Sequence, residues 1–315
     1  MELSPSVTQL SAGTWVISLP FQGEKDIIGS YLLTGGNELA LIDPGPETTL
    51  GALLEGIRNV GFDPQEVTHI IATHVHLDHA GAAGSLIQRM PHAKVYAHSK
   101  GVPHLLDTTK VVASATRIYG EERMQQFWGK IEPVPQDRLE VLEGGTILNV
   151  AGRRLEVHYA PGHAVHHVIF FDVHSGELFT GDAAGVRLQG VDYARPPILP
   201  PDFDLEAWSN TIDLMKRLRP DVLYVAHFGP TKNVTQHLER LREKLISWGD
   251  FVLSAMRDGK TEEEITQMLV AQTEPELQRV TRDPHTLYRY ELATNHPMTV
   301  QAYMRYWRKK HPERL

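Results

Sequence analysis

Four potential metal ligands lie within six consecutive positions of this chain, in the segment Thr-His-Val-His-Leu-Asp-His-Ala-Gly at 73–81: His74, His76, Asp78 and His79. An apolar run precedes the segment and small residues follow it, which predicts a strand, a short loop and the start of a helix. Alternate side chains leaving a strand point the same way, so His74 and His76 can face one site while Asp78 and His79 turn toward another. A single histidine is usually solvated or hydrogen-bonded, but four such groups at this spacing favour a metal site.

Three later positions can complete the ligand set, because each stands where a β-rich run meets a loop: His163 in Ala-Pro-Gly-His, Asp182 in Thr-Gly-Asp and His227 in Ala-His-Phe-Gly. Five histidines and two aspartates suffice for two metal ions. The chain contains no cysteine, so thiolate ligands, disulfides and cysteine nucleophiles are all excluded. Any metal must therefore be held by nitrogen and oxygen atoms.

Hydrophobic periodicity predicts two domains, 1–233 and 234–315. In the first domain, strands are expected at 15–19, 28–34, 39–42, 68–72, 94–97, 146–150, 154–159, 168–172, 177–180 and 222–226, and helices at 48–60, 80–90 and 205–218. The segment 99–138 mixes helix formers with prolines and is expected to be an insertion over the core. The second domain carries apolar residues at helical spacing, which predicts a helical subdomain.

Charge and composition limit the partners. Lys and Arg number 31 against 39 Asp and Glu, a net charge of −8, which is the opposite of a nucleic-acid footprint. No apolar run approaches membrane-spanning length, and residues 1–10 do not read as a signal peptide. We therefore expect a cytoplasmic protein with a small-molecule substrate, no nucleic-acid or membrane partner, and a homodimer as a permitted state.

Two other catalytic motifs are not supported. The chain has no Gly-x-Ser-x-Gly, so the usual serine-hydrolase nucleophile is missing. Gly259-Lys260-Thr261 looks like the end of a phosphate-binding loop, but Ser254 stands where the leading glycine should be. This segment is more simply the end of one helix and the N-cap of the next.

The ordered ligand series, with Leu-Ile-Asp-Pro-Gly at 41–45, resembles the metallo-β-lactamase superfamily over residues 13–230. The resemblance implies an α/β fold, a four-layer αββα sandwich with a C-terminal helical appendage. It also implies one metal bound by His74, His76 and His163, a second bound by Asp78, His79 and His227, and a bridging Asp182. Zinc is the expected metal because nitrogen ligands and hydrolysis both suit it, with iron, manganese or cobalt as alternatives.

The chemistry expected of such a site is hydrolysis. Two cations lower the pKa of a shared water toward about 7, which supplies a bridging hydroxide at neutral pH. We assign Asp78 as the catalytic residue that orients this hydroxide and carries its proton to the leaving group. Asp43 is expected to orient a ligand histidine, although a plain Asp-Pro-Gly turn stays open. The other histidines are expected to be structural, including His69, His98, His158, His166 and His167.

The resemblance implies a small ester, thioester or lactone as the substrate, as in glyoxalase II, acyl-thioesterases and quorum-signal lactonases. The lactonases carry a tyrosine soon after the bridging aspartate, where this chain has Gly185 and Val186, and its nearest tyrosine is Tyr193. Three alternatives stay open: a phosphodiesterase or nuclease of the same superfamily, a persulfide dioxygenase, and a metal-binding regulator with vestigial activity.

A substrate pocket is expected where the insertion at 99–138, the loop at 193–203 and the helical tail meet. Trp128, Tyr193 and Phe203 are candidates to line it, although ordinary packing explains each of them equally well. Arg187 and Arg195 are candidates to meet an anionic substrate group, or are plain surface charges.

Overall fold

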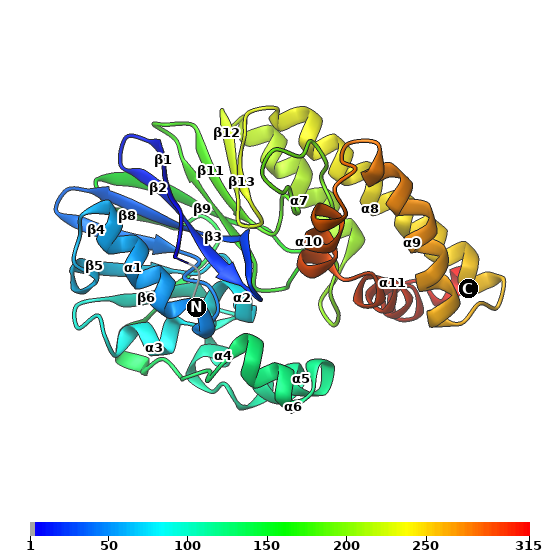
Figure 1. Cartoon of the computed structure of the whole chain (residues 1–315), viewed down its shortest axis with the longest axis horizontal. Coiled ribbons are helices and arrows are strands. Elements are labelled where there is room, and N and C mark those ends of the chain that lie inside the picture. The colour runs from blue at the N-terminus through cyan, green and yellow to red at the C-terminus, as the bar shows by residue number, and fades with distance from the viewer. Residues whose placement is uncertain (1–3) are drawn as a thin grey trace.

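The computed structural model describes residues 4–315, whose strands form two mixed sheets (Figure 1). The first sheet has the order β1 (Val7–Ser11), β2 (Thr14–Phe21), β3 (Glu24–Gly35), β4 (Glu38–Ile42), β5 (Val67–Ile71), β6 (Lys94–His98) and β7 (Leu139–Leu142). The second has the order β13 (Gly229–Thr231), β12 (Val222–Val225), β11 (Glu177–Gly181), β10 (Val168–Asp172), β9 (Arg153–Tyr159) and β8 (Ile147–Val150). Strands β4 to β7 pair in parallel, as do β11 and β12.

Helices cover the outer faces of both sheets. The α-helices of the described residues are α1 (Leu50–Val60), α2 (Leu77–Ala80), α3 (Ala83–Ile87), α4 (Val102–Leu106), α5 (Thr109–Tyr119), α6 (Glu121–Arg123), α7 (Leu205–Leu218), α8 (Val234–Arg257), α9 (Glu262–Gln278), α10 (Pro284–Thr294) and α11 (His296–Lys310). Of these, α1 and α3 pack on the first sheet, and α7 and α8 pack on the second. In Figure 1, α8–α11 extend to the right, away from α1 and α3, and α4–α6 form the lower edge. The expected αββα sandwich with a C-terminal helical region is confirmed.

The side-chain alternation of the strands builds three apolar layers. On β5, Ile70 packs under α1 and α3, whereas its neighbour Ile71 points between the two sheets. On β10, Phe170 points between the sheets and Ile169 packs under α7 and α8. Successive residues of β5 and β10 are therefore buried on opposite faces, which explains why Ile70–Ile71 and Ile169–Phe170 are apolar pairs rather than alternating with polar residues.

The C-terminal helices share the outer apolar layer of the second sheet. Trp208 of α7, Trp248 of α8 and Trp307 of α11 belong to one buried cluster. Thr261 caps α9 in a capping box with Glu264, so the segment resembling a phosphate-binding loop is a helix boundary. The helical character expected of this region is confirmed, whereas the domain boundary at 233/234 stays a prediction.

Four elements differ from the sequence expectation. The helix expected at 80–90 begins earlier, at Leu77, and is split into α2 and α3, because Ala82 N–H donates to the Gly45 carbonyl (2.9 Å) instead of continuing the helix. Strands β1, β7 and β13 were not expected, since edge strands of five, four and three residues carry too little periodicity to detect. Within residues 4–315, no helix combines the length and apolarity that a membrane span requires.

Gly162 lets α7 approach the loop that carries His163. Its φ is +131°, and a Cβ there would lie 2.3 Å from Trp208 Cα and 2.4 Å from Trp208 N. The Gly162 carbonyl also accepts a hydrogen bond from Asp204 N–H (2.9 Å) just before α7 begins. Only glycine satisfies both the backbone conformation and this contact.

We expect Gly162→Ala to lower the free energy of unfolding by about 2–4 kcal/mol, because the new methyl group meets backbone that cannot move easily. Gly145→Ala is the matched control, since Gly145 also has a positive φ (+93°) but nothing lies within 4 Å of its Cβ position. The control should cost about 1 kcal/mol. Urea unfolding of both variants measures the difference, and equal losses would contradict the packing argument.

Candidate metal centre

The candidate ligands come together at the carboxyl ends of strands from both sheets. His74 follows β5, His163 follows β9, Asp182 follows β11 and His227 follows β12. His76 is the residue before α2, and Asp78 and His79 lie inside that short helix. All seven residues that the sequence predicted as ligands therefore lie in one place, at the mouth between the two sheets.

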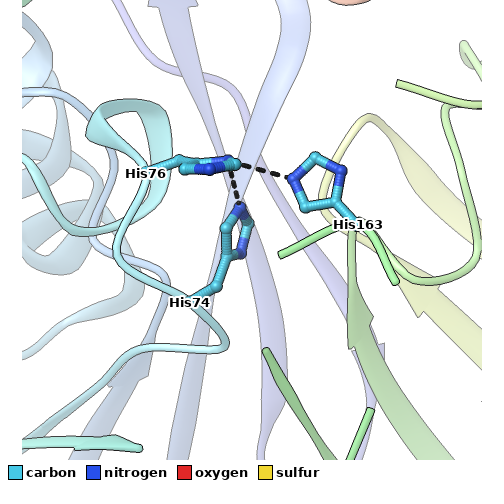
Figure 2. A group of neighbouring side chains, drawn as sticks. All are labelled: His74, His76 and His163. Atoms are coloured by element: carbon cyan, nitrogen blue, oxygen red, sulfur yellow. Dashed lines mark hydrogen bonds between the residues drawn. The ribbon is translucent and has the colours of Figure 1, made fainter. Parts of the chain in front are cut away.

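The first cluster consists of three histidine nitrogens that point at one another (Figure 2). His76 Nδ1 lies 3.0 Å from His74 Nε2 and 3.0 Å from His163 Nε2. Nitrogen ligands about 2.0–2.1 Å from zinc in a tetrahedron are separated by about 3.3 Å. The three nitrogens are thus arranged like three corners of a metal site.

The second cluster joins one carboxylate to two histidines. Asp78 Oδ2 lies 3.3 Å from His227 Nε2 and 3.5 Å from His79 Nε2. The side chains of both histidines are almost fully buried, whereas that of Asp78 is 23% exposed. Asp78 is therefore the member of this cluster that solvent and a substrate can reach.

Asp182 lies between the two clusters. Its Oδ1 is 3.2 Å from His79 Nε2 and 3.3 Å from His227 Nε2, while its Oδ2 is 3.3 Å from His163 Nε2. The two oxygens of one carboxylate thus face different clusters. This is the geometry required of a ligand shared by two metal ions.

Hydrogen bonds from the opposite ring edge hold three of the histidines. His163 Nδ1 donates to the Pro197 carbonyl (2.8 Å), and His227 Nδ1 donates to the Ile27 carbonyl (2.7 Å). A proton on Nδ1 leaves the lone pair of Nε2 free for a metal. The ring orientation is therefore set by backbone atoms far away in the sequence.

Asp43 holds the third of these rings. Its Oδ2 accepts from His79 Nδ1 (2.9 Å), and its Oδ1 accepts from the backbone N–H of Thr73 (2.8 Å). Thr73 Oγ1 also donates to this carboxylate and lies 3.1 Å from His74 Nδ1. One buried carboxylate thus orients a histidine in each cluster.

Burial and neighbouring charges shift the pKa values of the candidate ligands. Burial lowers the pKa of His74 well below its usual range and that of His76 to about 3. For Asp78, burial raises the pKa, but the nearby His79 and His227 outweigh it and lower the pKa to about 2. The pKa of Asp182 is likewise held low by its histidine neighbours, against the effect of burial. Both carboxylates are therefore ionised at neutral pH.

His79 and His227 shift in the opposite direction. Burial lowers the pKa of each ring, but Asp182 and Asp78 raise it more, so the net pKa of both histidines is raised. Within the described residues, His79 Nε2 and Asp182 Oδ1 are buried without a hydrogen-bond partner. The Asp78 and Asp182 carboxylates both face His79 Nε2, and together these groups form a donor set that fits cations, which must displace the histidine protons on binding.

A cleft opens over the two clusters. A cavity of about 590 Å³ reaches His76 and Asp78 and is walled by α5, by residues 199–202 and by Met298 of α11. An adjoining cavity of about 200 Å³ also reaches Asp78 and is bounded by residues 291–295. The insertion and the C-terminal helices therefore build the walls of the site, in agreement with the pocket expected from the sequence.

The three candidate pocket residues differ in their placement. Trp128 lines both cavities. Tyr193 is not among the lining residues and packs edge-on against Tyr290, and Phe203 packs against Tyr303 in the apolar layer under α11. For these two aromatic residues the placement favours the packing interpretation.

Neither expectation for Arg195 is correct. The side chain is 3% exposed, and its guanidinium donates to Glu291 Oε2 (2.9 Å) and contacts His296. It is therefore a buried anchor that joins the loop after Asp182 to α10 and α11. Arg187 lines neither cavity, and its side chain reaches the Pro230 carbonyl (3.5 Å).

Sequence reasoning missed the role of His167. Asp182 N–H donates to His167 Nε2 (3.2 Å), so this histidine positions the backbone of the shared carboxylate. His167 lies four residues after His163 in the same loop, and this short separation from a candidate ligand was the sequence feature that could have indicated a role at the site.

Comparison with known proteins identifies relatives of the whole fold. The family described as Metallo-beta-lactamase superfamily matches residues 25–227. The metallo-beta-lactamase fold-containing protein ST1585 of Sulfurisphaera tokodaii is 29% identical over 227 residues, which is 70% of this chain and 80% of that protein. The crystal structure of metallo-beta-lactamase family protein TTHA1429 from Thermus thermophilus has a TM-score of 0.71 and 26% identity, with 96% of this chain and 95% of that chain covered.

A third relative carries a named activity. Thioesterase pkgB of Emericella nidulans is 25% identical over 223 residues, which is 71% of this chain. The match covers 51% of that protein, so this chain spans about half the length of the fungal relative.

We expect Asp43→Asn to weaken metal binding by about 10–100-fold, because the substitution removes the charge that holds the His79 ring and the Thr73 hydroxyl. Competition with a chromogenic chelator measures the affinity. Asp258→Asn, on the exposed end of α8, is the control for removing one aspartate charge. Unchanged metal affinity in Asp43→Asn would assign Asp43 to the turn alone.

Proposed function

We propose that this chain, which belongs to the metallo-β-lactamase superfamily and is a metal-binding hydrolase, cleaves a small thioester at a two-metal centre. Esters and lactones are the neighbouring substrate classes. The observation that carries the proposal is the Asp182 carboxylate, whose two oxygens face two separate clusters beneath an open cleft. The similarity to a named thioesterase supports the choice of bond.

The ligand assignment follows the two clusters. His74, His76 and His163 would hold one ion, Asp78, His79 and His227 the other, and Asp182 both. Two such cations, with zinc as the first expectation and iron or manganese as alternatives, lower the pKa of water and polarise an acyl oxygen when bound.

Asp78 is the residue proposed to move the proton. It lines both cavities, and its Oδ2 is shared between His79 and His227, while Oδ1 has no partner among the described residues. Its low pKa keeps the carboxylate ionised, and Oδ1 is the atom that would accept a proton from attacking water, whose own pKa bound cations would lower. Asp78 borders the cleft in which the substrate would bind, so it can pass that proton to the departing thiolate.

The walls of the cleft favour a substrate that is part apolar and part anionic. Apolar side chains of Val111, Ile118 and Leu199 line the larger cavity. Lys110 and Arg117 of α5 lie on the same cavity, are exposed, and have no ion-pair partner within residues 4–315. Asp78 and Asp202 line the same cavity, but Lys110 and Arg117 lie seven residues apart and so share one face of α5, and we propose that they attract an anionic thiol carrier.

We expect the purified protein to hold about two metal ions per chain and to hydrolyse an acyl thioester in a chelator-sensitive way. Plasma mass spectrometry measures the metal, and a panel of thioester, aryl ester, lactone and phosphodiester ranks the bonds. Turnover that survives complete metal removal would overturn the proposal. Phosphodiester cleavage alone would replace it with the phosphodiesterase alternative.

We expect Lys110→Glu/Arg117→Glu to raise KM for an anionic thioester by about 10-fold or more, because two attractive charges become repulsive. Turnover of a neutral thioester should change little, and added salt should narrow the difference. Arg308→Glu, an exposed charge reversal on α11, is the control. Equal effects on charged and neutral thioesters would contradict the charge argument.

A further inference from the structure

His166 lies in the cleft but belongs to neither metal cluster. It stands in the loop between β9 and β10, three residues after His163, and its side chain lines the larger cavity. Its ring stacks on that of His74 (6.1 Å between centroids) and lies 5.5 Å from that of His76. His166 therefore lies beside the candidate ligands and faces the cavity without belonging to either metal cluster.

One backbone contact determines the chemical form of the ring. The N–H of Val75, which lies between two candidate ligands, donates to His166 Nδ1 (3.3 Å). An imidazole nitrogen that accepts must carry a lone pair, so the neutral ring carries its proton on Nε2.

The opposite ring edge remains available. His166 Nε2 has no hydrogen-bond partner within residues 4–315, and it is not among the buried polar atoms left without one. Since Nδ1 is committed to Val75, Nε2–H is the edge that the cavity can use. The protein thus presents a fixed, uncharged hydrogen-bond donor beside the first histidine cluster.

We propose that His166 is a catalytic residue that donates a hydrogen bond from Nε2 to the acyl oxygen of a substrate bound in the cleft. The proposal rests on the proposed function. In the hydrolysis, the oxygen of water bonds to the acyl carbon, the carbon–sulfur bond breaks, and the proton from water goes to the thiolate. His166 keeps its own proton throughout and stabilises the charge that develops on the acyl oxygen.

The kinetic test compares His166→Ala with His166→Gln in the metal-loaded protein. We expect His166→Ala to lower kcat by about 10²–10³-fold with little change in KM, because the donor acts on charge that develops during the reaction. His166→Gln keeps an acceptor for Val75 and a donor for the acyl oxygen, so it should recover part of this loss. His174→Ala, in the exposed β10–β11 turn, is the control for removing a histidine.

Two further readouts separate this role from others. Metal content should be equal in all variants, and loss of metal in His166→Ala would make His166 part of the metal centre and overturn the proposal. The kcat penalty should also be the same for thioesters of good and poor leaving thiols. A penalty that grows as the thiol becomes a poorer leaving group would place His166 on the leaving group instead.

A direct measurement does not depend on turnover. Nitrogen-15 spectra of the zinc-loaded protein, with His166 assigned by comparison with His166→Gln, should show the neutral form with the proton on Nε2 at pH 7. A neutral ring with the proton on Nδ1, or a charged ring, would overturn the proposal for His166 but not the proposed function. Wild-type protein that cleaves no acyl substrate would overturn both this proposal and the proposed function, whereas full activity in His166→Ala would overturn only this one.

Discussion

The structure depends on the pairing of buried carboxylates with histidines at the joint between the two sheets. Asp43 and Asp182 are both almost fully buried, and a carboxylate in that position is costly unless every oxygen meets a donor or a cation. Asp43 meets three donors from His79 and Thr73. Asp182 meets histidine nitrogens instead, which is why the two aspartates differ in what they can bind.

The two sheets contribute unequally to this joint. The first sheet supplies the short ligand-bearing segment after β5 together with Asp43, and the second supplies His163, Asp182 and His227. A hydrogen bond also joins the two sheets, because the Ile27 carbonyl in β3 accepts from His227 Nδ1–H. The relative position of the sheets is therefore part of the geometry of the site rather than a separate property of the core.

Much of this could be predicted from the sequence because the informative features are local. The apolar runs predicted most strands, and α7 has the bounds 205–218 expected from its periodicity. The position of each candidate ligand at a strand end was also local. The carbonyl partners Ile27 and Pro197 could not be predicted, because they lie 200 and 34 residues from the histidines they hold. Arg195 was misjudged for the same reason, since its partner Glu291 lies 96 residues later.

The Arg195 anchor also limits how this protein can change. It ties the loop that follows Asp182 to α10 and α11, and residues at the junction of these two helices border the cleft. A substitution that removed the Glu291 carboxylate while α10 and α11 stayed in place would leave the buried Arg195 guanidinium unpaired, at a cost of several kcal/mol. The loop after Asp182 and the helical wall of the cleft are thus joined by one ion pair, whereas α5, which also lines the cleft, has no such pair among the described residues.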